Sequence, residues 1–391
     1  MSSVVLYFIA ILTFILLLWK RIYALIFMLC ILTIDFDAAF MLDIETQIKI
    51  IFLAISIIYM ITYGIRKEYI KTYVVFIAIL ILSLSVAHFT SDYSLAGALK
   101  SSMSFFLGLN FICTNFKEDQ KIKIEKCLML LPIISLLIGV ISGSFIIAKG
   151  RIGGASGATN LAFLTVNSII AAIGLYMKFR DNKYIFYCFA SFAICFLTLT
   201  RGGILASGIV MLSILPFFFR KMTPRKVGLV IVTICIGIAA LFYSWDKLIS
   251  RMYSDGELNT SGRSVAWEYI ISLNDNPLRG QGYGKLTTME FTGAYIDHFS
   301  AAHNEFVRSY FETGLIGMGL LIVIFFIIFK SVFKNKIINK TQFLCIALAF
   351  TLYSFTDNTI SNYIFWIPFM LNLNMLYQKT TFQLKTQKAN V

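Results

Sequence analysis

The amino-acid sequence predicts an all-α polytopic membrane protein with about 12–13 transmembrane helices. Of its 391 residues, 58% are hydrophobic and 14% are charged. Soluble domains carry about 25% charged residues and disordered chains have low hydrophobicity, so both classes are excluded. The apolar runs are continuous and nearly as long as a membrane helix, whereas the strands of a membrane β-barrel alternate apolar and polar residues. The net charge of +14 does not require a nucleic-acid partner, because cytoplasmic loops of membrane proteins carry excess Lys and Arg.

Thirteen apolar segments follow one another along the chain. A transmembrane helix needs about 17–25 largely apolar residues, and several segments are close to this lower limit. The first two are the weakest and are separated only by Lys20 and Arg21, which is why twelve helices remain an alternative. The segments are Val4–Trp19, Ile22–Ile34, Ile48–Tyr63, Tyr73–Phe89, Leu95–Cys113, Leu128–Ala148, Leu161–Met177, Tyr184–Leu199, Gly202–Phe219, Val227–Trp245, Leu315–Phe329, Phe343–Phe355 and Tyr363–Tyr377.

The distribution of charge predicts the orientation in the membrane. If the long polar segment 246–313 lies outside, 23 of the 34 Lys and Arg residues fall on the inside and 15 of the 20 acidic residues fall on the outside. Positive residues accumulate on the cytoplasmic side, so this orientation is favoured and the C-terminus is inside. The chain then divides into N-terminal helices with outer loops (1–245), one long outer loop (246–313) and C-terminal helices (314–391).

The other eleven cations lie on the outer side, against the general trend. Lys49 and Lys100 look incidental, and the remaining nine lie beside one glycine-rich loop, one helix start or the long loop. Such residues either pair with the acids of the loops or form a site for an anionic ligand. An Arg at a membrane boundary is costly unless it snorkels to the interface or pairs. These cations are Lys149, Arg151, Arg201, Lys247, Arg251, Arg263, Arg279, Lys285 and Arg308.

The long loop has a definite order of elements. Residues 261–264 signal a helix start, and residues 265–271 read as an amphipathic helix at the membrane interface. Three alternating glycines, at positions 280, 282 and 284, then permit close approach of the backbone to a neighbour. His303 follows, just before the next membrane helix, and we expect His88 and His298 to be structural.

Several of these motifs resemble the O-antigen ligase and Wzy polymerase superfamily. Arg201-Gly202-Gly203 is similar to its Ser-Arg-Gly-Gly motif, with Thr200 in place of Ser. The order of the motifs in the long loop, and the position of that loop before the last helices, also resemble the family. The loop motifs are Arg263-x-x-x-Trp267, Pro277-x-x-Gly280-x-Gly282-x-Gly284, His303-Asn304-x-Phe306 and Glu312-x-Gly314-x-x-Gly317.

The resemblance implies a C-type glycosyltransferase of the B subclass in the bacterial inner membrane. Such an enzyme uses undecaprenyl-diphosphate-linked glycans as donor and acceptor, at the periplasmic face and without a metal or other cofactor. The long loop is then periplasmic and the C-terminus cytoplasmic. Membrane lipids, a chain-length regulator and a flippase are the expected partners, and no nucleic acid is expected.

The resemblance also assigns roles to particular residues. His303 and Arg201 are the expected catalytic pair. An imidazole can accept a proton near neutral pH, and an arginine fork can stabilise a departing diphosphate. The remaining candidates for binding of the diphosphate or the substrate are Arg151, Arg263, Arg279, Arg308, Gly282 and Asn304. A rival feature is Asp35-Phe36-Asp37 in the first outer loop, since related transferases that use lipid monophosphates place acidic residues there.

Three functions remain open at this stage. The leading prediction is an O-antigen polymerase that joins lipid-linked repeat units, because the abundance of Ile, Phe, Lys and Asn is typical of serotype-specific gene clusters. The first alternative is an O-antigen ligase that transfers the finished glycan to lipid A-core. The second is a polysaccharide flippase or transporter, although nearly all charged residues lie in loops rather than inside the helix bundle.

Overall fold

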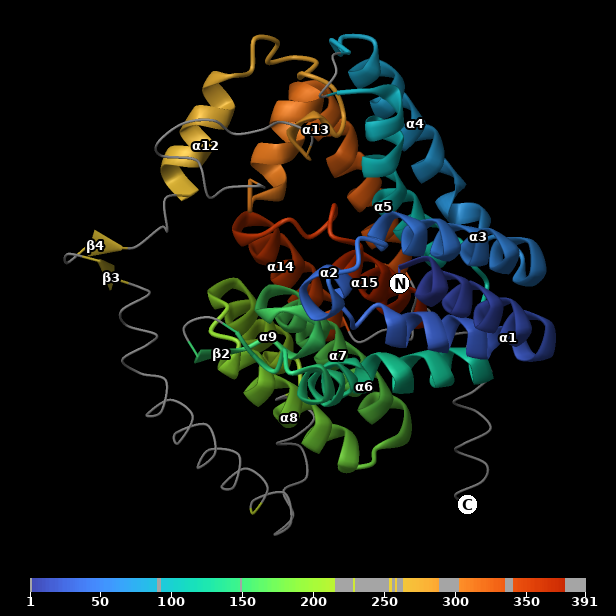
Figure 1. Ribbon diagram of the computed structural model, residues 1–391. Coiled ribbons are helices and arrows are strands. Elements are labelled where there is room, and N and C mark those ends of the chain that lie inside the picture. Colours follow the sequence, from blue (N-terminus) through green and yellow to red (C-terminus); the bar gives the residue numbers. More distant parts are fainter. Residues whose placement is uncertain are drawn as a thin grey trace.

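A computed structural model describes residues 2–89, 93–147, 150–214, 228, 253–254, 257–258, 263–287, 302–334 and 340–376. Within these residues the protein is almost entirely helical (Figure 1). The helices are α1 (Ser2–Ile31), α2 (Phe36–Phe40), α3 (Glu45–Tyr63), α4 (Ile70–Leu84), α5 (Leu95–Cys113), α6 (Glu118–Ser142), α7 (Ala158–Phe179), α8 (Lys183–Leu197), α9 (Arg201–Leu212), α12 (Arg263–Ser272), α13 (Glu305–Phe333), α14 (Lys340–Thr356) and α15 (Tyr363–Leu376).

Short elements complete the described chain. Two antiparallel pairs of strands are present, β1 (Ile146–Ile147) with β2 (Arg151–Ile152), and β3 (Tyr253–Ser254) with β4 (Glu257–Leu258). Three 3₁₀ turns are also present: η1 (Lys67–Tyr69), η3 (Gly154–Ser156) and η4 (Lys285–Thr287).

The helices confirm an all-α polytopic membrane protein. Among the described residues, six helices are long and apolar enough to cross a membrane (α1, α3, α5, α6, α7 and α13), and α8, α9 and α15 are shorter apolar helices. Each predicted span that falls on described residues coincides with a helix. The predicted span Val227–Trp245 and the predicted inner loop Arg220–Lys226 lie outside the described residues, apart from Gly228.

The first two predicted spans lie in one helix with a break. Lys20 has the extended angles φ −147° and ψ 98° inside α1. The hydroxyl of Thr13 contacts the sulfur of Met28 at 3.4 Å, so the two halves of α1 fold against each other. Two polar residues between the apolar runs were therefore a sufficient signal for a break in the chain.

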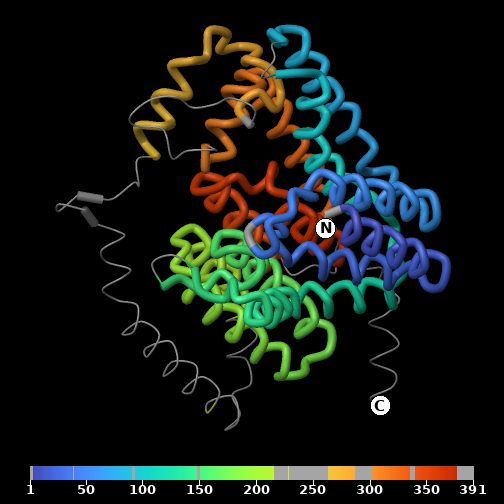
Figure 2. The backbone as a smooth tube through the Cα atoms, in the orientation of Figure 1, coloured from blue at the N-terminus to red at the C-terminus, as the bar shows by residue number. Residues whose placement is uncertain are grey.

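Helices α14 and α15 lie at the centre of the molecule. Helix α15 packs on α5 and α7, and α14 packs on α9 and α13 (Figure 1). The contact of α15 with α5 is very close, because a Cβ at Gly108 would lie 2.1 Å from the indole nitrogen of Trp366. The smooth backbone trace shows the red C-terminal helices next to the orange α13 (Figure 2). The turn between α14 and α15 contacts the start of α13 through the hydrogen bond of Ile360 with Glu305, and the end of α14 contacts α12 through Arg263. That turn is the place on which the motif residues converge.

Candidate functional site

The Arg201-Gly202-Gly203 motif begins α9. A Cβ at Gly202 would lie 2.1 Å from the hydroxyl of Thr356, and a Cβ at Gly203 would lie 2.8 Å from the Cβ of Ala162. Only glycine therefore lets the start of α9 pack directly on the end of α14 and on α7. The two glycines place Arg201 next to the last residue of α14.

Arg151, on β2, is held at the same turn. Its Nε donates a hydrogen bond to the carbonyl of Thr198 (2.9 Å), and its Nη2 donates to the hydroxyl of Thr200 (3.0 Å). These two threonines end the connection from α8 and lead into Arg201. The Thr200 that replaces the usual Ser of the motif thus supplies a hydroxyl that orients a second arginine.

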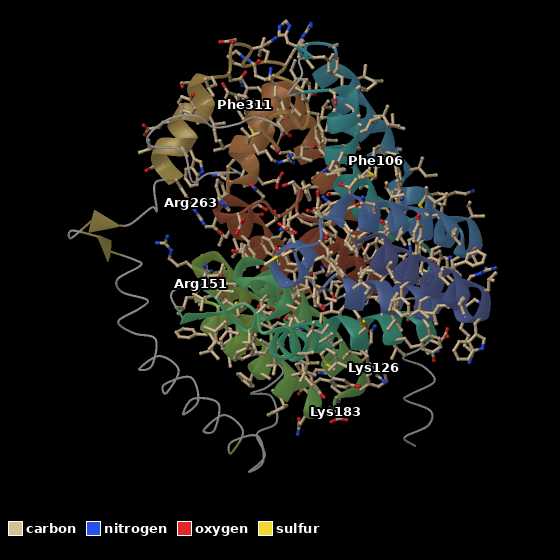
Figure 3. All side chains as sticks on the ribbon, viewed as in Figure 1. Phe106, Lys126, Arg151, Lys183, Arg263 and Phe311 are labelled. Atoms are coloured by element: carbon tan, nitrogen blue, oxygen red, sulfur yellow. The ribbon has the colours of Figure 1, made fainter. Side chains whose placement is uncertain are left out.

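Arg263 and Trp267 lie four residues apart on α12 and so share one helix face. Arg263 Nη1 donates to the carbonyl of Thr356 (2.6 Å), and Trp267 Nε1 donates to the carbonyl of Ala302 (2.7 Å). Arg263 and Arg151 appear on the same side of the molecule, at the start of α12 and at β2 respectively (Figure 3). The motif therefore connects α12 both to the end of α14 and to Ala302, the residue that precedes His303.

His303 pairs with an acid that sequence reasoning missed. Its Nδ1 lies 3.2 Å from Oδ1 of Asp357, which directly follows α14. The Asp357 side chain is 9% exposed and that of His303 is 34% exposed. A signal was available, because Asp357 is the only acidic residue after Glu312 and lies between two apolar segments. An ionisable residue in such a position indicates a functional site.

Asn304 and Glu305 hold this pair in place. The side chain of Asn304 accepts hydrogen bonds from the first backbone amides of α13, so it acts as the N-cap of that helix. Glu305 Oε2 accepts a hydrogen bond from the backbone amide of Ile360 (2.9 Å). This bond fixes the turn between α14 and α15 against α13, and therefore Asp357 against His303.

Arg308 is part of a buried ion-pair group. Its guanidinium lies between Glu305 and Glu312, with Nε 2.7 Å from Glu305 Oε1 and Nη1 2.7 Å from Glu312 Oε2. Arg308 is 3% exposed and lies over the ring of Tyr283 at 5.7 Å. Burial raises the pKa of Tyr283, so this phenol stays neutral beside the group. Arg308 thus forms its ion pairs with Glu305 and Glu312 rather than with a group next to His303.

The glycine motif of the long loop packs on a break in α13. Gly314 has φ 63° and ψ −171°, which interrupts the helical hydrogen bonds. The loop replaces them: Gln281 N donates to Phe311 O (2.8 Å), Gly282 N to Glu312 O (3.0 Å), Leu315 N to Pro277 O (2.9 Å) and Ile316 N to Leu278 O (3.1 Å). Residues 277–284 thus form a splint across the break, which we name the loop splint.

Two further candidates, Gly282 and Arg279, belong to the loop splint and lie apart from Arg151 and Arg263 in the chain. Gly282 is buried, and a Cβ there would lie 2.8 Å from Ala87 Cβ and from the hydroxyl of Tyr93. Arg279 is exposed, and its backbone amide binds the side chain of Asn276. The structure does not bring either residue together with His303.

A cavity of about 450 Å³ opens beside His303. Its walls come from four parts of the chain: the segment from the end of α1 to the start of α3, the start of α7, the residue pair before α13, and the turn between α14 and α15. The residues that line it are Ile34, Asp35, Phe36, Asp37, Leu42, Asp43, Glu45, Ile48, Thr159, Asn160, His303, Asp357, Asn358, Ser361, Asn362, Tyr363 and Ile364.

The rival acidic motif lies in this same cavity. Asp35 and Asp37 face the cavity together with His303, although they are far from it in sequence. Among the described residues, no group of three or more His, Cys, Asp or Glu side chains is arranged to hold a metal ion. The two acids therefore contribute negative charge to the wall of the cavity.

This geometry defines a class of protein: a multi-pass membrane protein with a histidine–carboxylate pair next to the end of α14, where Arg263 binds and the glycines after Arg201 pack. Arginines bind phosphate oxygens, and a histidine held by a carboxylate can take up a proton from a hydroxyl group.

Comparison with known families identifies the domain. Residues 186–322 match the O-antigen ligase family (Wzy_C), and this stretch contains the Arg201 motif, α12, the loop splint and His303. Over this stretch the match supports the O-antigen ligase and Wzy polymerase superfamily that the motifs resemble, and with it a glycosyltransferase-like enzyme of the ligase or polymerase kind. No curated protein matches the chain.

Proposed function

We propose that the protein is an O-antigen polymerase that joins undecaprenyl-diphosphate-linked repeat units at the periplasmic face of the inner membrane. The observation that carries the proposal is the His303–Asp357 pair, 3.2 Å apart, next to the end of α14, where Arg263 donates a hydrogen bond to Thr356 and the glycines after Arg201 pack. Arg151 is held at Thr198 and Thr200, just before Arg201. The family match supports the superfamily, and the composition of the chain favours the polymerase over the ligase.

The reaction transfers a glycan from a lipid diphosphate to a sugar hydroxyl. The oxygen of the acceptor hydroxyl attacks the anomeric carbon of the donor, and the bond from that carbon to the diphosphate oxygen breaks. Undecaprenyl diphosphate leaves with the electron pair of this bond. His303 accepts the proton of the hydroxyl at Nε2, because its Nδ1 faces Asp357. The carboxylate holds the imidazole in position and stabilises the imidazolium that forms.

The arginines stabilise the departing diphosphate. Negative charge on the leaving oxygen grows as the bond breaks, and fixed guanidinium groups bind it more strongly in the transition state than in the ground state. Arg151 and Arg263 are oriented by hydrogen bonds to Thr200 and to the carbonyl of Thr356. This preorganisation removes the need to reorient the side chains during the reaction.

Deletion of the gene, followed by electrophoresis of the lipopolysaccharide, tests the function. A polymerase deletion leaves core with a single repeat unit. Core without any repeat unit would indicate a ligase, and repeat units that accumulate on the cytoplasmic side of the membrane would indicate a flippase.

Two substitutions of His303 test the proton transfer in the purified protein. With His303→Ala and His303→Gln, we expect undecaprenyl diphosphate to bind as before and transfer to fall by about 10²–10⁴-fold. Full transfer by His303→Gln would show that an imidazole base is not required.

A further inference from the structure

The cavity beside His303 has a polar composition that the proton transfer alone does not explain. Among the residues that the structure describes, its lining contains no Lys and no Arg, whereas four acids, Asp35, Asp37, Asp43 and Glu45, lie on one wall. A diphosphate would be repelled from such a wall. The diphosphate and the contents of this cavity must therefore be chemically different.

Part of the acidic wall is uncompensated. Glu45 pairs with Lys49 at 2.6 Å, and Asp357 pairs with His303. Asp37 and Asp43 are exposed at the cavity and make no ion pair within the described residues. At neutral pH the wall thus presents negative charge and several hydrogen-bond acceptors to whatever enters.

A buried tyrosine provides an independent sign of a ligand. Tyr363 lines the cavity and is 6% exposed, and its hydroxyl has no hydrogen-bond partner in the described part of the chain. Its ring is held in place beneath the Nζ of Lys49, at 4.8 Å. Asn358 also lines the cavity, and its Oδ1 is buried without a hydrogen-bond partner among the described residues. Buried polar atoms are normally hydrogen-bonded, so a ligand with a polar group would complete this one.

The amide side chains favour a hydroxyl-rich ligand. Asn160 and Asn362 line the cavity and are fixed to each other by a 3.0 Å hydrogen bond. Amides both donate and accept hydrogen bonds, as sugar hydroxyls do. Carboxylates accept strong hydrogen bonds from sugar hydroxyls. The volume of about 450 Å³ falls within the range of about 300–1,000 Å³ that is typical of small-molecule sites.

We propose that this cavity is the acceptor subsite, and that its acidic wall selects a neutral or amino-bearing terminal sugar over a uronic acid. The inference rests on the proposed function, because His303 must reach the hydroxyl of the bound acceptor. It goes beyond that function by assigning Asp37, Asp43 and Tyr363 to recognition of the acceptor and by naming the class of sugar.

Saturation-transfer NMR on the protein in lipid nanodiscs tests the proposal. The probes are methyl glucoside, methyl glucosaminide and methyl glucuronide at pH 7.5. We expect the first two to bind at least about tenfold better than the glucuronide, because like charges repel across a binding site. Binding of none of the three, or equal binding of the glucuronide, would overturn the proposal.

Charge-removing variants locate the selectivity. In a double variant, Asp37→Asn with Asp43→Asn, the glucuronide should bind like the glucoside. The matched control is Asp275→Asn, an exposed acid of the long loop that does not line the cavity, and it should keep the wild-type preference. Unchanged selectivity in a folded double variant would overturn the role of the acidic wall.

Transfer from the lipid-linked donor is measured on the same wild-type preparation. Transfer without binding of any methyl glycoside refutes the acceptor subsite alone. Selective glycoside binding without any transfer refutes the proposed function and leaves the sugar site in place.

Discussion

Replacement of Asp357 by Asn is the most informative test of the site. The amide keeps nearly the same shape and retains Oδ1, which accepts a hydrogen bond from the amide of Asn358 at 2.9 Å. The turn after α14 should therefore persist. What the variant loses is the negative charge that faces the imidazolium of His303 in the transition state.

The expected magnitude comes from the separation of 3.2 Å. Two unit charges at that distance attract by about 5 kcal/mol at an effective dielectric constant of about 20, and by about 1 kcal/mol in bulk water. Because the His303 side chain is 34% exposed, we expect an intermediate loss of about 2–3 kcal/mol. This loss corresponds to a fall in transfer rate of roughly 30- to 150-fold.

The assay is single-turnover transfer from a lipid-linked donor by purified protein, with binding of undecaprenyl diphosphate measured in parallel. Binding should not change, because the arginines are intact. Asp275→Asn serves as the matched exposed-acid control. A rate for Asp357→Asn within twofold of the wild type would refute the view that this carboxylate supports a charged His303 during the reaction.

Three further predictions concern other parts of the molecule. Arg263→Lys keeps the charge but loses the planar fork and its bond to Thr356, so transfer should fall by about 10²–10³-fold at unchanged protein level, measured with the same assay. Gly314→Ala should lower the melting temperature strongly, because the added Cβ would lie 2.4 Å from the carbonyl of Leu278 and the backbone there has a φ of 63°. The control is Gly319→Ala, whose added Cβ has nothing within 4 Å, and it should leave the melting temperature unchanged or raise it. A reporter active only in the periplasm should be active when fused after Ser254 and silent after Arg225; the reverse result would place the arginines on the wrong side for the donor.

The fold was predictable because hydropathy alone determines which segments enter the membrane. The first and last residues of the helices were less predictable from the sequence. Helix α13 begins at Glu305 rather than at Leu315, because Asn304 caps it and the buried pair of Arg308 with Glu305 allows charged residues inside the helix. The i,i+3 spacing of this pair is local, but the hydrogen bond that Glu305 accepts from Ile360 comes from another element and cannot be read from the local sequence.

The site was predictable in part. Arg263 donates a hydrogen bond to the end of α14 and the glycines after Arg201 pack there, but the partner of His303 was missed, since the pairing joins residues 54 positions apart. The glycines of the long loop attracted attention for their possible approach to a ligand. Their close neighbours are instead protein: the backbone of α13 at Glu312 and Thr313 for Gly280, the side chains of Ala87 and Tyr93 for Gly282, and Ser101 for Gly284. These contacts join segments far apart in the sequence, so only the three-dimensional arrangement reveals them.

The loop splint also limits how the outer segment can change in length. It supplies four backbone hydrogen bonds across the break in α13, and each bond left unmade near the membrane would expose a polar group without a partner. The splint also holds the two parts of α13 at a fixed angle, and with it the position of His303 relative to the apolar part of that helix. We therefore expect a single residue inserted between Pro277 and Gly284 to shift the register of these four bonds and to displace the first part of α13, together with the His303 that precedes it.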